Sequence, residues 1–514
     1  MTKADDLFDA LGRIDDDLIP DLPDSMVEAL PSEAEDLPDS VREAVAAEAG
    51  RGATPVLVPK RRGVGFWIRI AAGVTAAAVL AGVLLPKVLP GKKEKYMAKN
   101  LALPSYPEAV LYPDAANGYD EKFETAFRNW LDSRDKRLNQ PTGYRTGFDT
   151  FFRTSTSAFL EDKENKNLIY SPLSLYIALG MAAETSSGNT RQQILNLLGE
   201  SEISTLREHE KSVFIANYVN DGAGKCVLGN SVWLNIDLPY VEDTVKALSE
   251  GYFASVYSGD PTSEKYEQEL RDWINAQTDN LLSDAIDNVN MDKNLLMMLV
   301  STVNFSAHWK NSFNSADTKR STFQAPGNKT VECDFMNAQE DLPYYAGENY
   351  TATELPFENG SSMRLILPDK GVDVQDLLQD EGFMKDLLNI NFAYRGGSAL
   401  VELSLPKFDI TSESDLIPKL QALGITDAFD ATKCDLSSIT TSSDSVSITQ
   451  VKQDVRVMID EEGCKGVAVT MIAAAGVAAI TRTEKMVLDR PFIFEIVSDA
   501  GMPLFVGVVN DPTA

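Results

Sequence analysis

The stretch Asn167-Leu-Ile-Tyr-Ser171-Pro172-Leu-Ser174 marks the start of the folded part of the chain. A serine placed directly before a proline is typical of a helix N-cap followed by the first helical residue. The apolar residues on either side of this point recur at helical spacing and predict amphipathic helices over 148–160 and 171–198.

Strand-forming runs follow in the second half of the chain, for example 363–368 and 400–410. Helices that crowd the first half and strands that crowd the second favour an α+β fold over alternating β-α units. No glycine-rich phosphate loop and no internal repeat interrupts this pattern.

The composition limits what the protein can do. Its 514 residues include 47 Lys+Arg and 77 Asp+Glu, a net charge of -30, which repels phosphate groups, so we expect no nucleic-acid partner. With His209 and His308 as its two histidines, the chain cannot build a multi-histidine metal site, and any catalytic triad would need one of them. We therefore expect no metal and no cofactor, and an enzymatic function would have few of the usual catalytic residues available.

The cysteines are widely spaced and form no CxxC pair, which predicts free thiols, although one disulfide between distant cysteines stays open. They are Cys226, Cys333, Cys434 and Cys464.

The N-terminal region predicts a membrane anchor. Residues 1–50 hold fifteen Asp/Glu against three Lys/Arg, and we interpret 1–60 as a disordered acidic tail. Val64–Leu85 follows as 22 residues whose only charge is Arg69, with basic residues on both sides. This predicts a transmembrane signal-anchor helix over 64–86, with a buried Ala/Val helix as the alternative. The tail would lie in the cytoplasm, and 87–140 would form an extracytoplasmic stalk.

From 148 onward, nine motifs keep an order and spacing that resemble the serpin family. In chain order they are Ser171-Pro172-Leu-Ser174, Ala178-Leu179-Gly180-Met181, Gly188-Asn189-Thr190, Asn230 with Trp233, Phe305-Ser-Ala-His-Trp309-Lys310, Glu354-Leu355-Pro356-Phe357, Leu405-Pro406-Lys407-Phe408, Asp460-Glu461-Glu462-Gly463 and Asp489-Arg490-Pro491-Phe492. The resemblance implies a large central β-sheet with two smaller sheets and about nine helices, placed in a domain over 141–514. It also implies a monomer similar to bacterial membrane-anchored serpins.

The resemblance assigns roles to five residues in the body of the domain. It implies that Ser171, Ser174, Asn230 and Gln453 form a polar cluster beneath the point where the central sheet opens, with Gln453 where many members carry histidine. Trp309 would lie at the top of the sheet, where an inserting loop first enters. Taken alone, Ser171 would be an ordinary N-cap and Trp309 an ordinary core residue.

Between Gly463 and Asp489 lies a segment whose part 466–481 has neither charge nor proline. It is too short for a second membrane span, and a buried helix or core strand is the alternative interpretation. The resemblance instead implies a reactive-centre loop at about 463–489, which a protease cuts before the loop inserts as a new strand. Its hinge would comprise Glu461, Glu462, Gly463, Cys464, Gly466, Ala468 and Thr470.

Strand alternation would place Cys464, Gly466, Ala468 and Thr470 on the inward face of the inserted loop. The family spacing of sixteen positions beyond Glu461 makes Val477–Ala478 the reactive bond. A small aliphatic residue there indicates elastase-like or subtilisin-like serine proteases. Ile480 or a neighbour stays an alternative, as does Arg482, which would indicate trypsin-like targets.

We therefore expect a suicide inhibitor of serine proteases at the cell surface. The alternative is a non-inhibitory serpin that acts as a binding or chaperone-like module. Small residues in the hinge favour inhibition, although Cys464, Lys465 and Gly466 each depart from the commoner residues of the family.

Overall fold

The computed structural model describes ten parts of the chain: residues 98–113, 121–141, 148–162, 164–282, 291, 295–387, 393–442, 447–448, 451–464 and 482–514. The acidic tail, the predicted span 64–86 and the loop residues Gly466, Ala468, Thr470, Val477 and Ala478 lie outside them. Within the described parts, no helix has both the length and the apolar character needed to span a bilayer.

The predicted helices form where the sequence pattern placed them, with one break. Helix α5 is Phe148–Leu160, whereas 171–198 divides into α6 (Pro172–Thr185) and α7 (Gly188–Leu198). The break falls just before Gly188, whose φ of 52° lies in the left-handed region that glycine tolerates best. The Ser171 side chain caps α6 by accepting from the Ser174 amide.

Seven more α-helices complete the described set of ten, against about nine expected. They are α4 (Glu121–Leu138), α8 (Ile203–Asn217), α9 (Glu242–Gly251), α10 (Glu264–Gln277), α12 (Val374–Leu378), α13 (Glu381–Leu387) and α14 (Ile417–Ala422).

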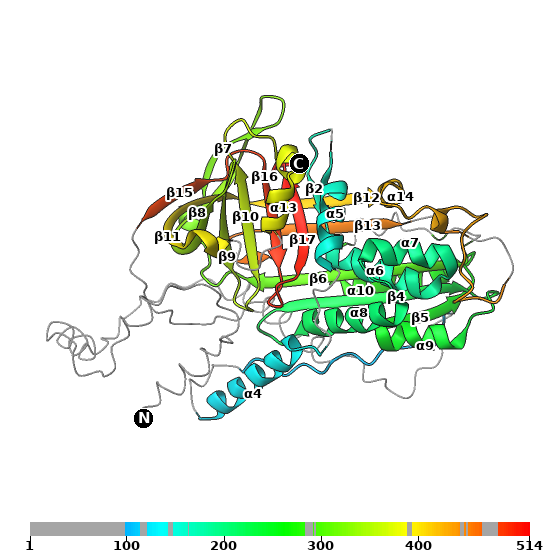
Figure 1. Ribbon diagram of the computed structural model, residues 1–514. Coiled ribbons are helices and arrows are strands. Elements are labelled where there is room, and N and C mark those ends of the chain that lie inside the picture. Colours follow the sequence, from blue (N-terminus) through cyan, green and yellow to red (C-terminus); the bar gives the residue numbers. More distant parts are fainter. Residues whose placement is uncertain are drawn as a thin grey trace, which may run out of the picture. The chain divides into compact units, whose positions relative to one another are not determined.

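The described residues form two sheets. The first has eight strands, including β3 (Val219–Asn220), which pairs with β4 off the main path. The path runs β1 (Lys99–Ala102), β5 (Ala254–Gly259), β4 (Lys225–Asn235), β6 (Met297–His308), β14 (Gly463–Cys464), β13 (Lys452–Ile459) and β12 (Phe408–Asp415). Nearly all of β4 is buried, as expected for a central strand covered on both faces. Figure 1 shows β12 beside β13 and β4 beside β6, with α6 next to β6.

The second sheet has nine strands, where the resemblance implied two smaller sheets. Its path runs β15 (Thr483–Val487), β11 (Ser398–Pro406), β8 (Lys329–Ala346), β9 (Tyr350–Pro356), β10 (Ser362–Pro368), β16 (Phe492–Val497), β17 (Pro503–Val509) and β2 (Leu168–Tyr170), while β7 (Lys319–Ala325) pairs with β8. The long strand β8 joins the two expected sheets, because its first part pairs with β7 and β11 and its end pairs with β9.

The predicted strand over 400–410 is likewise two strands, since the chain leaves the nine-stranded sheet after β11 and enters the eight-stranded sheet as β12. Lys407 occupies the crossover between them. All four cysteines are free thiols. Burial raises the pKa of Cys226 to about 12.

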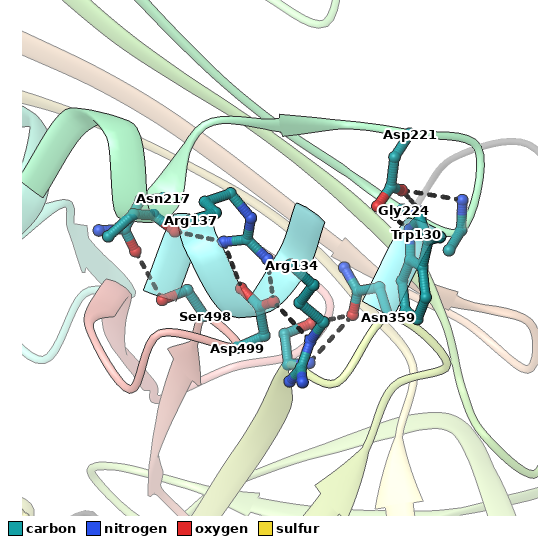
Figure 2. Close-up of polar contacts among 12 residues, drawn as sticks. Trp130, Arg134, Arg137, Asn217, Asp221, Gly224, Asn359, Ser498 and Asp499 are labelled. Atoms are coloured by element: carbon teal, nitrogen blue, oxygen red, sulfur yellow. Dashed lines mark hydrogen bonds and ion pairs between the residues drawn. The ribbon is translucent and has the colours of Figure 1, made fainter. Parts of the chain in front are cut away.

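Residues 98–113 and 121–138, called the N-terminal arm below, dock on both sheets. Strand β1 pairs antiparallel with β5, and Trp130 of α4 donates a 2.8 Å hydrogen bond from Nε1 to Asp221 in the β3–β4 turn. Arg134 and Arg137 form ion pairs with Asp499 in the β16–β17 turn, as Figure 2 shows. Part of the expected stalk 87–140 therefore supplies a strand and a helix to the fold.

Candidate functional site

The candidate site is centred on the two residues of β14. Gly463 pairs with His308 and Cys464 with Ala307 on β6, while Cys464 also pairs with Ile459 on β13. The Asp460 carboxylate holds the preceding turn, since its Oδ1 accepts from the amides of Glu462 at 2.9 Å and Gly463 at 3.3 Å. Two residues of the predicted hinge, Gly463 and Cys464, are thus already part of the central sheet.

Gly463 meets a steric requirement that no other residue satisfies. Its φ is 147°, and a Cβ built on it would lie 2.3 Å from the Ala307 carbonyl oxygen. The close atoms belong to the backbone of β6 and cannot rotate away. Glycine here therefore allows the hinge to approach β6.

Trp309 stabilises the turn that precedes β14. Its side chain is 1% exposed and stacks on Phe357 with 4.5 Å between ring centroids. The indole Nε1 donates to the Asp460 carbonyl at 2.9 Å, and the backbone amide donates to the Glu462 carbonyl at 3.0 Å. In the structure Trp309 thus contacts the turn that precedes β14, while its role in loop entry stays a prediction.

Glu461 connects the hinge to the crossover between β11 and β12 and to the residue just before β7. Lys407 Nζ lies 2.7 Å from its Oε2, and Thr318 Oγ1 donates to its Oε1 at 2.8 Å. Burial acts to raise the pKa of Glu461, but the hydrogen bonds from Lys407 and Thr318 outweigh it and hold this pKa below its usual value. Glu462, in contrast, is exposed. Lys407 stood within a sequence motif, but nothing in the sequence paired it or Thr318 with Glu461.

Below β14, the two neighbouring strands are not paired with each other. Among the pairings of the described residues, β6 and β13 meet only through β14. A cavity of about 410 Å³ is lined by Met297–Phe305 of β6 and Gln453–Arg456 of β13. Residues of α6 line it as well, and so do Leu281 and Leu282 after α10.

Three of the four predicted cluster residues lie at this cavity. Ser171 and Gln453 form two reciprocal hydrogen bonds: the Ser171 amide donates to Gln453 Oε1 at 2.9 Å, and Gln453 Nε2 donates to the Ser171 carbonyl at 3.0 Å. Ser174 Oγ donates to the Ser301 carbonyl of β6 at 3.0 Å. An amide supplies one donor and one acceptor here, as a neutral histidine would.

Asn230 does not join this cluster. It stands opposite Ser301 in the β4–β6 register, but its Nδ2 donates to the Tyr252 carbonyl at 2.7 Å. Its side chain therefore connects β4 to the end of α9. Within the described parts of the chain, Asn230 Oδ1 has no hydrogen-bond partner.

The two histidines lie in different elements, His209 on α8 and His308 at the end of β6. His209 Nδ1 lies 2.6 Å from Glu200 Oε1, on the helical side of the fold. No group of three or more His, Cys, Asp or Glu side chains in the described ranges is placed to hold a metal ion.

Two residues of β14 lie between β6 and β13, and a cavity lies beneath them. This arrangement defines an α+β protein in which β6 and β13, within the described residues, are joined only through β14.

The comparisons with known proteins identify the family. A family model described as "Serpin (serine protease inhibitor)" matches residues 149–512, so the chain belongs to the serpin family. It is 29% identical over 361 residues to Serpin A3-6 of Bos taurus, covering 68% of this chain and 84% of the relative. It is 25% identical over 360 residues to Serpin-Z1C of Triticum aestivum, covering 67% of this chain and 90% of that protein.

Solved structures agree on the fold. The native state of tengpin, a thermophilic serpin, matches with a TM-score of 0.64 at 24% identity, covering 81% of this chain and 100% of tengpin. Thyroxine-binding globulin in complex with thyroxine matches with a TM-score of 0.61 at 21% identity, covering 72% of this chain and 100% of the globulin. At these identities the likeness concerns the fold alone.

Proposed function

We propose that this protein is a suicide inhibitor of serine proteases that prefer a small aliphatic residue, of the elastase or subtilisin type. In this proposal the protease attacks the bond after Val477 and forms an acyl-enzyme. The cut segment then continues β14 downward between β6 and β13. The protein itself supplies no catalytic group.

The observation that carries this proposal is the position of Cys464. Its pairing with both β6 and β13 supplies the first rung of the proposed strand, directly above the cavity. The Cys464 side chain is 6% exposed, which fits the inward face expected from strand alternation. A loop that inserts below Cys464 does not have to separate β6 from β13 at the top of the sheet, because β14 already lies between them.

Insertion would be strongly favourable. A strand contributes about 1 kcal/mol net for each backbone hydrogen bond and roughly 1 kcal/mol or more for each buried apolar side chain. A dozen residues would thus add on the order of ten to twenty kcal/mol, comparable with the whole stability of a domain. The uncut protein would then be held in its fold kinetically.

The proposal includes a membrane location. The apolar run 64–86 with its basic flanks supports a single-pass signal anchor in a bacterial membrane, with the N-terminus in the cytoplasm and the inhibitory domain outside. Protease treatment of intact cells, followed by blotting for both ends of the chain, tests this topology. Loss of the C-terminal domain with retention of residues 1–60 supports it, and protection of the C-terminal domain contradicts it.

Incubation of residues 98–514 with elastase, followed by denaturing electrophoresis, tests the inhibitory function. A complex that resists denaturant supports it. Cleavage without a complex would instead favour a non-inhibitory binding or chaperone-like module.

A matched pair of substitutions tests strand insertion itself. Ala468→Lys would place a charge on the inward face, and Val467→Lys would place it on the opposite face. The first variant should become a substrate that elastase cuts without being trapped, whereas the second should still form the complex. Equal behaviour of the two variants would contradict insertion in this register.

A further inference from the structure

Arg482, where the described chain resumes after the loop, is fixed to the body of the protein. Its Nη2 donates to the Tyr344 carbonyl at 2.9 Å and to the Gly396 carbonyl at 2.8 Å. The guanidinium carbon lies 5.6 Å from the centroid of the Tyr344 ring, a cation–π distance. The side chain is 40% exposed, but these contacts direct its charged end toward the protein.

The two carbonyls converge because Gly396 packs closely on Tyr344. A Cβ on Gly396 would lie 2.0 Å from the Tyr344 carbonyl oxygen, so a larger residue could not occupy this position. A planar guanidinium can serve both acceptors at once, which a lysine ammonium does with less directional precision. The site is therefore shaped for arginine.

The backbone of Arg482 is fixed as well. Its carbonyl accepts a 3.0 Å hydrogen bond from the Leu400 amide, and Thr483, the next residue, pairs with Leu400 as the first rung of the parallel β11–β15 ladder. The peptide bond between Arg482 and Thr483 is thus already part of the nine-stranded sheet.

A trypsin-like protease needs both of these groups. The arginine side chain must enter its acidic pocket, and the carbonyl of the bond to be cut must enter its oxyanion hole. Here the side chain and the carbonyl are both engaged within the protein. For Arg482 to enter a protease, its hydrogen bonds must first break. Each such bond from a charged donor lowers the fraction of protein molecules with an accessible Arg482 by roughly ten- to a hundredfold.

We propose that Arg482 is the C-terminal attachment point of the reactive-centre loop and not its specificity residue. This inference rests on the proposed function and narrows its targets. The reactive bond then lies in the uncharged stretch 466–481, so trypsin-like proteases are excluded as targets and proteases with apolar pockets are selected. Arg482 acts as a positioning residue that sets where the loop ends.

The first test compares cleavage by trypsin of the unchanged protein and of Val477→Arg, with the cut bonds identified by mass spectrometry of the fragments. We expect trypsin to cut Val477→Arg after residue 477 at least a hundredfold faster than it cuts the unchanged protein after Arg482. Comparable rates at the two positions would overturn the inference. This test identifies which bond trypsin cuts, so its result does not depend on whether trypsin is trapped. If elastase fails to form a complex, that result bears on the proposed function and not on this inference.

The second test addresses positioning, using Arg482→Gln with Lys485→Gln as the control. Lys485 is exposed on the same strand, and its change removes the same charge. We expect Arg482→Gln to raise several-fold the number of inhibitor molecules consumed per elastase trapped, with Arg482→Lys giving partial rescue and Lys485→Gln no effect. An unchanged ratio in Arg482→Gln would contradict the positioning role.

Discussion

Cys464 pairs with Ala307 in antiparallel register, so the residue after the hinge glycine already belongs to the central sheet of the uncut protein. Its other neighbour in the sheet is Ile459 of β13. The two strands that would receive the loop are therefore held apart at their top by the loop's own first residues.

Replacing Gly463 with alanine should expel these residues from the sheet. The added Cβ would meet the backbone of β6 at 2.3 Å, and a φ of 147° is itself strained for alanine. We expect the free energy of unfolding to fall by about 1–3 kcal/mol. Hydrogen exchange at the Cys464 and Trp309 amides should become faster, and unchanged protection of both amides would argue against a requirement for glycine.

Acid should weaken the attachment of the hinge through Glu461. Its folded pKa lies below the usual 4.5, so the stabilisation is complete above pH 4.5 and is lost as the pH falls through the folded value. Thermal unfolding of the unchanged protein and of Glu461→Gln should differ most at neutral pH and converge in acid. A difference that stays constant from pH 7 to pH 3 would contradict this linkage.

The docking of the N-terminal arm should depend on Asp499. Its side chain is 7% exposed and faces Arg134 and Arg137, so Asp499→Asn removes the charge with little change in shape (Figure 2). Because both arginines are partly exposed, we expect a loss of about 1–3 kcal/mol rather than the larger cost of a fully buried pair. Limited proteolysis should cut residues 98–141 faster in this variant.

The control for the arm is the exposed pair of Arg128 and Glu124 on the same helix, with side chains 76% and 51% exposed. Arg128→Ala should leave proteolysis unchanged. If both variants are cut at the rate of the unchanged protein, the arm does not depend on Asp499.

Glu210 on α8 should make the protein less stable at high pH. It is 1% exposed, its carboxylate oxygens have no hydrogen-bond partner among the described residues, and Gly180 of α6 packs against it. Burial and the charge of Glu200 raise its pKa well above the usual 4.5. Folding therefore favours the protonated acid, and the resulting cost grows as the pH rises above 4.5.

The variant Glu210→Gln removes this cost, because an amide of the same shape carries no charge. We expect its melting temperature to exceed that of the unchanged protein at pH 8 and to equal it near pH 4. The exposed neighbour Glu208→Gln serves as the control. Equal destabilisation by Glu210→Gln at both pH values would refute the prediction.

Local sequence signals predicted the local structure of the site. The Ser171 cap and the start of α6 each depend on a few neighbouring residues, and the structure has both. The inward position of Cys464 in the inserted loop stays a prediction. The division of 171–198 into two helices depended on one glycine conformation, which helical periodicity does not detect.

Contacts between distant residues were not predictable in the same way. Asn230 binds the Tyr252 carbonyl, and Glu461 binds Lys407, because strand register and helix packing bring them together. No short-range sequence pattern predicts that Trp130 binds Asp221 or that two carbonyls bind Arg482. These contacts follow only from the assembled sheets.

The most direct test of strand insertion is the thermal stability of residues 98–514 before and after a single cut within 466–481. The inserted strand should raise the melting temperature by roughly 10–25 °C, because an unfolding entropy of about 2 cal/mol/K per residue makes each kcal/mol worth roughly 1 °C in a domain of this size. A cut protein that melts at or below the temperature of the intact protein would contradict the account.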